Sequence, residues 1–241
     1  MGREQNMEGN NPFFTVVMPA YGVEKYLEKA VETIKEQTFE DWELIIVEDG
    51  SPDKTAEIAE ELQTTDTRIR VIHHEKNKGL SEARNTGIQA GKGHYIWFMD
   101  PDDTVDSTLL ENVADSLNKN PANLVIFGHV EEYYNEDGSF AYAHEIKPDK
   151  KYFTTPDRIH NYVIRLEQET IYGYAWNKLY DLDYIKKKNL QYETVRLIED
   201  IVFNIQYCMD IESMLILDIT PYHYAKRMSG SLTTKFVPDY Y

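Results

Sequence analysis

The segment that decides the fold runs Leu44-Ile45-Ile46-Val47-Glu48-Asp49-Gly50-Ser51-Pro52. Its short, apolar and β-branched start is typical of a strand that is buried on both faces of a sheet. Polar residues then end the strand, and Ser51-Pro52 is typical of the first positions of a helix. Ile58, Ala59 and Leu62 would give that helix a buried face. The segment therefore predicts a strand that is followed at once by a helix.

The same alternation extends to both sides of this segment. The other expected strands are Thr15–Met18, Ile69–His73 and Tyr95–Met99, and the other expected helices are Tyr26–Gln37 and Ser81–Ala90. Strands and helices that alternate at this spacing indicate a mostly parallel sheet with helices on both faces. We therefore expect an α/β fold that is built on such a central sheet.

After Asp106 the alternation becomes less regular. The expected helices are Leu109–Leu117, Pro156–Leu166 and Ile198–Met209, and the expected strands are Leu124–Val130, Met214–Ile219 and Tyr222–Ala225. Residues 135–138 are a turn signal between strand-like flanks rich in tyrosine. In the helix over residues 198–209 the side chains expected to point inward are Ile201, Val202, Ile205 and Cys208. Because no linker rich in Gly, Ser or Pro interrupts the chain, we expect one domain that follows a polar tail over residues 1–12.

The charge and the cysteine content restrict the partners and the compartment. The 241 residues include 25 basic and 42 acidic side chains, which gives a formal net charge of −17. This charge makes a nucleic-acid polymer a poor partner and disfavours broad adhesion to an anionic membrane. Cys208 is the only cysteine, and the sequence contains neither a signal-peptide pattern nor an apolar run of ~18 residues. We therefore expect a cytoplasmic protein, and peripheral contact with the inner face of the membrane stays open, as does the oligomeric state.

Three polar clusters follow predicted strands, namely Pro19-Ala20-Tyr21, Glu48-Asp49-Gly50-Ser51 and Asp100-Pro101-Asp102-Asp103. Ligands of open α/β sheets bind beyond the carboxyl ends of the strands, so these clusters predict a site at one edge of the sheet. The carboxylates of the third cluster repel one another, and a divalent cation relieves such repulsion. Mg²⁺ typically takes one or two carboxylates together with substrate phosphates. The alternative interpretation of the third cluster is a solvated acidic turn that caps the next helix.

Four ordered motifs carry a resemblance to a known family. They are Val16-Val17-Met18-Pro19-Ala20-Tyr21, Ile45-Ile46-Val47-Glu48-Asp49-Gly50-Ser51, Gly79-Leu80-Ser81-Glu82-Ala83-Arg84-Asn85-Thr86-Gly87 and Phe98-Met99-Asp100-Pro101-Asp102-Asp103. In this order the motifs resemble family 2 glycosyltransferases of the GT-A fold, and the resemblance is tight over residues 13–106. A looser resemblance, to bacterial enzymes that build surface polysaccharides, continues through Trp176-Asn177-Lys178-Leu179-Tyr180, Glu199-Asp200 and Arg227-Met228-Ser229-Gly230-Ser231.

The resemblance implies that residues 13–106 bind a nucleotide-sugar donor, with UDP as the nucleotide. Tyr21 would stack on the base, Asp49 would accept a hydrogen bond from the uracil imide, and Arg84 would face the phosphates. The implied nucleotide-binding residues are Pro19, Tyr21, Asp49, Arg84, Asp102 and Arg227. Asp103 and Asp102 would coordinate Mn²⁺ or Mg²⁺ as the cofactor. Without the resemblance, Tyr21, Asp49 and Arg84 would be an ordinary strand-end aromatic residue, a turn aspartate and a surface arginine.

The resemblance assigns residues 107–241 to the acceptor, which would be a saccharide or a lipid-linked saccharide. Asp200 would be the general base and Glu199 the second choice, since a carboxylate can take the proton of an attacking hydroxyl. One displacement opposite the diphosphate would invert the anomeric configuration. Both acids also suit the start of a helix for electrostatic reasons alone, which is the structural alternative.

Two groups of residues in the second half have a functional and a structural interpretation. His223, Lys226 and Arg227 form a basic island. In the functional interpretation Arg227 would close over the diphosphate, and in the structural one the island is a solvated basic turn. Trp176 and Tyr172 could form a stacking platform for an acceptor sugar. For Trp176 we favour a place in the hydrophobic core.

Two other functions compete with the transferase. Asp100-x-Asp102-x-Thr104 also fits the Asp-x-Asp-x-Thr pattern of haloacid dehalogenase-like phosphatases, although three strand-helix units precede it here. Hydrolysis of a generic phosphate ester without a sugar acceptor would favour that alternative. A non-catalytic protein that only binds sugar nucleotides is the other alternative, and the acid pair at residues 199–200 argues against it. A dinucleotide-binding site is not expected, because no Gly-x-Gly-x-x-Gly follows the first strand.

Overall fold

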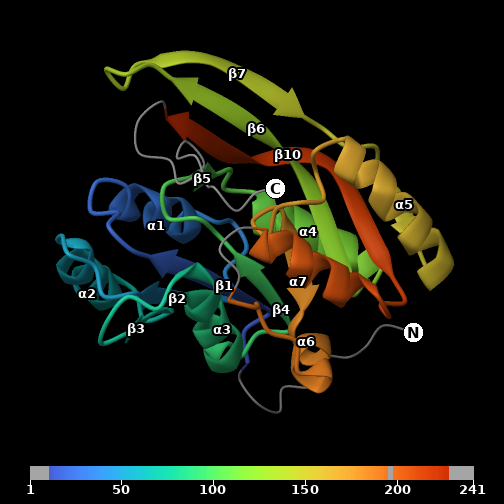
Figure 1. Ribbon diagram of the computed structural model, residues 1–241, viewed down its shortest axis with the longest axis horizontal. Coiled ribbons are helices and arrows are strands. Elements are labelled where there is room, and N and C mark those ends of the chain that lie inside the picture. The colour runs from blue at the N-terminus through green and yellow to red at the C-terminus, as the bar shows by residue number, and fades with distance from the viewer. Residues whose placement is uncertain (1–10, 195–197, 228–241) are drawn as a thin grey trace.

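The computed structural model describes residues 11–194 and 198–227, and in it one sheet of ten strands carries helices on both faces (Figure 1). The predicted α/β architecture is therefore confirmed. Among the described residues, no helix is long and apolar enough to cross a membrane.

The N-terminal part contains the expected alternation of strands and helices. Its elements are β1 (Phe14–Ala20), α1 (Leu27–Lys35), β2 (Trp42–Glu48), α2 (Thr55–Thr65), β3 (Ile69–His73), α3 (Leu80–Ala90) and β4 (Tyr95–Phe98). These four strands are parallel and lie in the order β3-β2-β1-β4. Val16 and Met18 of β1 belong to the core under α1 and α2, whereas Val17 belongs to the core under α3. The central strands β1 and β2 are mostly apolar because both faces of the sheet are covered there.

The start of α2 differs from the prediction. The helix begins at Thr55 and not at Ser51-Pro52. The carboxylate of Asp53 accepts hydrogen bonds from the N–H of Thr55 at 3.0 Å and from the N–H of Glu24 at 3.2 Å. The Ser51 N–H donates to the Glu48 carboxylate at 2.6 Å. These contacts hold the preceding residues as a loop at the edge of the sheet.

The C-terminal part extends the same sheet. Its elements are β5 (Thr104–Val105), α4 (Leu109–Lys119), β6 (Leu124–Tyr134), β7 (Phe140–Ile146), β8 (Lys151–Phe153), α5 (Pro156–Gln168), β9 (Lys178–Asp181), α6 (Leu182–Lys188), α7 (Glu199–Cys208) and β10 (Met214–Arg227). The order continues β4-β9-β6-β10-β5, with β9 antiparallel to both of its neighbours. The predicted hairpin around residues 135–138 is confirmed, since β6 and β7 pair antiparallel. The sequence did not predict β5, β8, β9 or α6.

The last strand is continuous where two strands were expected. β10 runs from Met214 to Arg227, and its register with β6 shifts between Leu217 and Tyr222. Pro221 lies in this shift and has no N–H with which to continue a ladder of hydrogen bonds. The strand therefore bulges at the proline and resumes its pairing afterwards.

The buried face of α7 also differs from the prediction. Ile205 is 51% exposed, whereas Phe203, Asn204, Tyr207 and Cys208 are buried. The ring of Phe203 stacks on Tyr192 with 4.1 Å between the centroids, and the Tyr207 hydroxyl donates to the Asn123 carbonyl at 2.5 Å. The two aromatic side chains set the rotation of the helix because they bury more surface than the isoleucines would.

Candidate active site at the carboxyl ends of the strands

A buried arginine joins three segments that are far apart in the sequence. The guanidinium of Arg84, on α3, contacts Asp200 directly and lies 3.5 Å from Glu199 and 3.7 Å from Asp100. Its side chain is 2% exposed, and a buried charge requires partners of the opposite sign. Burial acts to lower the pKa of Arg84, but the attraction of these carboxylates outweighs it and raises that pKa. The predicted site residues Arg84, Glu199 and Asp200 therefore converge in one cluster, together with Asp100.

The two acids at the start of α7 have different surroundings. Asp200 contacts Arg84 through Oδ1, and its Oδ2 accepts the N–H of Ala175 at 3.0 Å. Both carboxylate oxygens are thus held in one orientation. Burial, followed by repulsion from Asp200, raises the pKa of Glu199.

Of the three acids that follow β4, Asp103 is fully buried, and Asp100 and Asp102 are more accessible. Asp103 is 1% exposed and accepts the hydroxyl of Tyr222 at 2.7 Å and the N–H of Ala225 at 2.8 Å. Both of its oxygens are therefore occupied by contacts with β10. Asp102 has a side chain that is 41% exposed. Burial raises the pKa of Asp100 to about 7. Arg84 acts to lower this pKa, and repulsion from the neighbouring acids acts to raise it.

The burial of Asp103, together with these contacts, does not favour it as the metal ligand that the sequence predicts. In the described part of the chain, no three side chains of the metal-binding types are grouped around one point. Asp102 and Asp100 are the acids of this cluster whose oxygens are less fully occupied by protein donors.

The basic island at the end of β10 consists of paired charges. Arg227 donates to the Asp102 carboxylate at 3.0 Å and to its carbonyl at 2.9 Å. His223 contacts Glu132 at 2.9 Å and Lys226 contacts Glu131 at 2.5 Å. The predicted solvated turn is therefore wrong for the described residues, because these side chains lie on a strand and pair with acids. Arg227 does lie beside the acids that follow β4.

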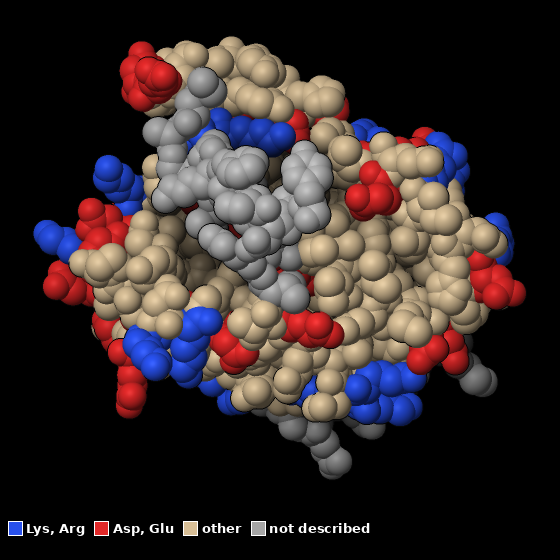
Figure 2. Space-filling view, in the orientation of Figure 1, with Lys and Arg blue, Asp and Glu red and all other residues tan. Residues whose placement is uncertain are grey.

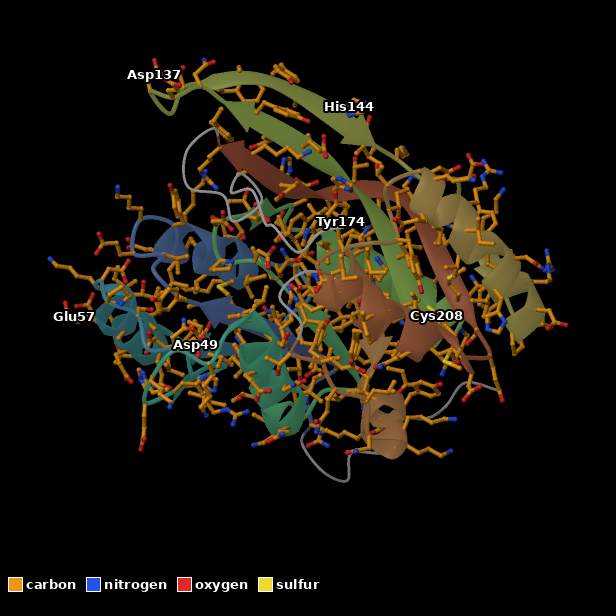
Figure 3. The ribbon with its side chains drawn as sticks, in the orientation of Figure 1. Asp49, Glu57, Asp137, His144, Tyr174 and Cys208 are labelled. Atoms are coloured by element: carbon orange, nitrogen blue, oxygen red, sulfur yellow. The ribbon has the colours of Figure 1, made fainter. Side chains whose placement is uncertain are left out.

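The residues predicted to bind the base lie at the ends of β1 and β2, and Figure 3 labels Asp49 at the end of β2. Tyr21 directly follows β1 and is 50% exposed, and Pro19 is buried within β1. Asp49 is 3% exposed and accepts hydrogen bonds from the ring of His74 at 2.5 Å and from the N–H groups of Lys78 and Gly79 at 2.9 and 2.8 Å. Asp49 thus fixes the loop that precedes α3, the helix that carries Arg84.

Several residues of the site were not predicted from the sequence. The hydroxyl of Tyr222 accepts the N–H of Asp100 at 3.2 Å in addition to its contact with Asp103. The ring of Tyr192 lies 5.1 Å from the Arg84 guanidinium. A tyrosine in an apolar stretch has no sequence signal that separates it from a core residue. Trp176 stacks between Tyr174 and Tyr222 at 4.5 Å from each, so its predicted place in the core is confirmed.

Comparison with known proteins identifies the family. The model of the family described as "Glycosyl transferase family 2" matches residues 15–181. Glycosyltransferase EpsJ of Bacillus subtilis (strain 168) is 32% identical over 228 residues, which are 94% of this chain and 65% of that protein. Less than two thirds of that relative's length is therefore spanned.

Two solved structures have a similar fold. S. aureus TarS 1–349 in complex with UDP-GlcNAc aligns with a TM-score of 0.74 at 19% identity, over 93% of this chain and 61% of that chain. The mannosyltransferase PcManGT from Pyrobaculum calidifontis, in complex with GDP-Man and Mn²⁺, aligns with a TM-score of 0.60 at 15% identity, over 87% and 57% of the two chains. The family match favours a transferase over the phosphatase alternative. This chain belongs to glycosyl transferase family 2 and has the GT-A fold.

Proposed function

We propose that this chain transfers a sugar, with inversion, from a nucleotide diphosphate to a hydroxyl of a saccharide or a lipid-linked saccharide. The observation that carries the proposal is the convergence of Asp100, Glu199 and Asp200 on Arg84. The cluster combines residues from both halves of the chain at the edge of the sheet where ligands of α/β folds bind. TarS, which has the same fold, binds UDP-GlcNAc, and this supports a UDP-sugar donor.

The base of the donor would lie between the ends of β1 and β2. Tyr21 is exposed there and can stack on a base. Asp49 is buried and accepts three hydrogen bonds from the protein, so its assignment to the uracil imide rests on the resemblance to the family. The contacts of Arg84 favour a different role from the predicted one at the phosphates: it positions the acids. Arg227 remains our candidate for the diphosphate.

The residues present fit a divalent cation on Asp102, with Asp100 beside it. Mutual repulsion among the acids contributes to the raised pKa of Asp100, and a cation would relieve it. Mg²⁺ or Mn²⁺ needs only one or two protein carboxylates when phosphates complete its shell. The PcManGT complex contains Mn²⁺, which supports this assignment. A cation bound here would neutralise the charge that develops on the departing diphosphate.

Asp200 is our candidate for the general base. The Ala175 N–H and the Arg84 guanidinium together fix the direction of its carboxylate. Each oxygen has a further lone pair with which it can accept the proton of the attacking hydroxyl. Glu199 is the alternative, because its raised pKa makes it the stronger base near neutral pH.

A panel of UDP-sugars and GDP-sugars tests this function without knowledge of the acceptor. We expect slow hydrolysis of a UDP-sugar, and thermal stabilisation by UDP, only when Mn²⁺ or Mg²⁺ is present. Stronger stabilisation by GDP than by UDP would overturn the UDP assignment and leave the transferase in place. If no nucleotide sugar binds or is hydrolysed with either cation, the proposed function is wrong.

A further inference from the structure

A row of four tyrosines extends from the acidic cluster to the outer strand β7. On β7, Tyr142 is 56% exposed, and its ring stacks on Tyr133 of β6 with 4.4 Å between the centroids. Tyr224 of β10 and Tyr174 continue the row, with their centroids 6.2 Å apart. Lys226 links its two parts, since its ammonium lies 5.2 Å from the Tyr133 ring and 5.6 Å from the Tyr224 ring. We call these four residues the tyrosine row.

The inner end of the tyrosine row is joined directly to the acids of the site. Tyr174 precedes Ala175, whose N–H donates to Asp200. Tyr224 precedes Ala225, whose N–H donates to Asp103. In Figure 3, Tyr174 lies near the middle of the molecule and Asp137 marks the tip of the β6–β7 hairpin. Adjacent strands are about 4.8 Å apart, so Tyr142 on β7 lies about 10 Å from β10, and the row is longer than one sugar ring.

The outer end of the tyrosine row borders a groove of about 600 Å³. Its walls include Tyr133, Tyr134, Tyr142, Lys226 and Arg227. In the space-filling view, basic side chains lie directly below the hairpin (Figure 2). These cations are neutralised locally, since Lys226 contacts Glu131 and Arg227 contacts Asp102. The groove thus combines aromatic faces and hydrogen-bonding groups, and both of its cations are paired with acids.

This combination suits a neutral ligand with many hydroxyl groups. Aromatic rings provide flat apolar surfaces for the C–H faces of sugar rings, and the phenol and charged groups provide partners for the hydroxyls. A polyanion would require unpaired cations, and a lipid surface would require an apolar patch without buried ion pairs. Single apolar residues scattered over a surface are normal, but four aromatic side chains in one row next to the acids indicate a binding surface.

We propose that the tyrosine row binds an acceptor that is a saccharide chain of several units, with its terminal unit at the acids and the preceding units along the row. This inference rests on the proposed function and adds to it the class and the minimum length of the acceptor. The hairpin offers a matched pair of variants, because Phe140 is 57% exposed on the same strand and packs against Tyr134 instead of Tyr133. Phe140 does not line the groove, whereas Tyr142 does.

The test titrates gluco-, galacto- and N-acetylgluco-oligosaccharides of two, four and six units into the full chain with UDP and Mn²⁺ present. We expect the hexasaccharide of at least one series to bind about tenfold more tightly than its disaccharide, the scale of a well-placed aromatic contact. Tyr142→Ala should remove this gain, whereas Tyr142→Phe and Phe140→Ala should keep it. The affinity for UDP should be the same in all four proteins.

Two results would overturn the proposal. One is a parent protein that binds UDP but shows no gain with chain length in any series. The other is an equal loss of that gain in Tyr142→Ala and Phe140→Ala, which would indicate a general effect on the hairpin. Failure of UDP binding in the parent protein would instead count against the proposed function, so the two failures are distinguishable.

Discussion

The guanidinium of Arg84 contacts the carboxylate of Asp200, although the two residues are 116 positions apart in the chain. The contact joins α3, in the half of the chain that we propose binds the donor, to the start of α7 in the second half. Because Asp200 also accepts the Ala175 N–H, its carboxylate is fixed from two directions. This fixed orientation suits the general base that we propose at Asp200.

The first prediction concerns the general base. Asp200→Asn keeps the shape of the side chain and removes the base, so sugar transfer should fall by ~10²-fold or more. The affinity for UDP should stay nearly unchanged, because Asp200 is not among the residues that we propose to bind the donor. Glu199→Gln should have the smaller effect. Transfer rates and UDP titrations of the two variants measure this.

Thermal unfolding of both variants serves as the control, since acids at a helix start also contribute to stability. An inactive Glu199→Gln with normal UDP binding, beside an active Asp200→Asn, would move the base to residue 199. Parental rates in both variants would mean that α7 is only structural.

The second prediction concerns Arg84 as the support of the acids. Arg84→Met would leave Asp200 and its neighbours without their buried counter-charge, and we expect a loss of about 3–5 kcal/mol in the free energy of unfolding. Asp200→Asn in the same chain should recover part of that loss, because the two residues interact. Urea unfolding of the two single variants and the double variant gives the coupling energy. Additive effects would show that Arg84 does not act through Asp200.

The third prediction separates the metal ligand from the structural acid. Mn²⁺ should tighten UDP binding in the parent protein, and Asp102→Ala should lose most of that gain. Asp103→Ala should keep the gain but lower the free energy of unfolding, because the Tyr222 hydroxyl and the Ala225 N–H lose their acceptor. Each polar group left unpaired costs about 1–3 kcal/mol.

UDP titrations with Mn²⁺ and with chelator, together with urea unfolding, distinguish the two variants. If Asp103→Ala remains folded and still loses the Mn²⁺ gain, Asp103 is a ligand as the sequence alone suggests.

The parallel half of the fold was predictable because both of its signals are local. β1 to β4 each contain a short apolar, mostly β-branched or aromatic run, and each helix between them has an apolar periodicity. The position of the site at one edge of the sheet was predictable from the topology, since the carboxyl ends of parallel strands lie at the same edge. The local sequence does not show which carboxylate oxygens already accept hydrogen bonds from other parts of the protein. The occupation of Asp103 by Tyr222 depends on a strand that begins more than a hundred residues later.

Part of the second half was less predictable because several of its elements are short. β9 and α6 share a boundary at Asp181 and Leu182, so neither pattern is long enough to show a period. In α7 the positions of the isoleucines predict one buried face of the helix, and the positions of the aromatic residues predict another. Packing against Tyr192 decides between them, and Tyr192 belongs to another segment.

The fourth prediction tests that rotation of α7. Phe203→Ala should lower the free energy of unfolding by about 3–5 kcal/mol, because it removes a fully buried ring. Ile205→Gln should change it by less than about 0.5 kcal/mol, since Ile205 is exposed. Urea unfolding of each variant provides the comparison. A larger loss from Ile205→Gln than from Phe203→Ala would restore the buried face predicted from the sequence.

The last prediction concerns His129, a buried histidine whose ring nitrogens have no hydrogen-bond partner among the described residues. Its ring packs edge-on against Trp176 with 4.7 Å between the centroids. Burial lowers the pKa of His129 to about 4, although the nearby Glu131 acts in the opposite direction.

Between pH 6.5 and pH 4 the unfolded chain therefore binds a proton at this residue that the folded chain does not bind. Above pH 6.5 the titration of His129 should not affect the free energy of unfolding. As the pH falls from 6.5 to 4, it should lower that free energy by up to about 3 kcal/mol. His129→Phe keeps the edge-on packing and removes the titration, so its free energy of unfolding should decline less steeply over the same range. Urea unfolding of both proteins at pH 7, 6, 5 and 4 measures the difference, in which the carboxylates common to both proteins cancel. Parallel declines would mean that residue 129 is protonated equally in the folded and unfolded chains, and that its ring reaches water or an acceptor in solution.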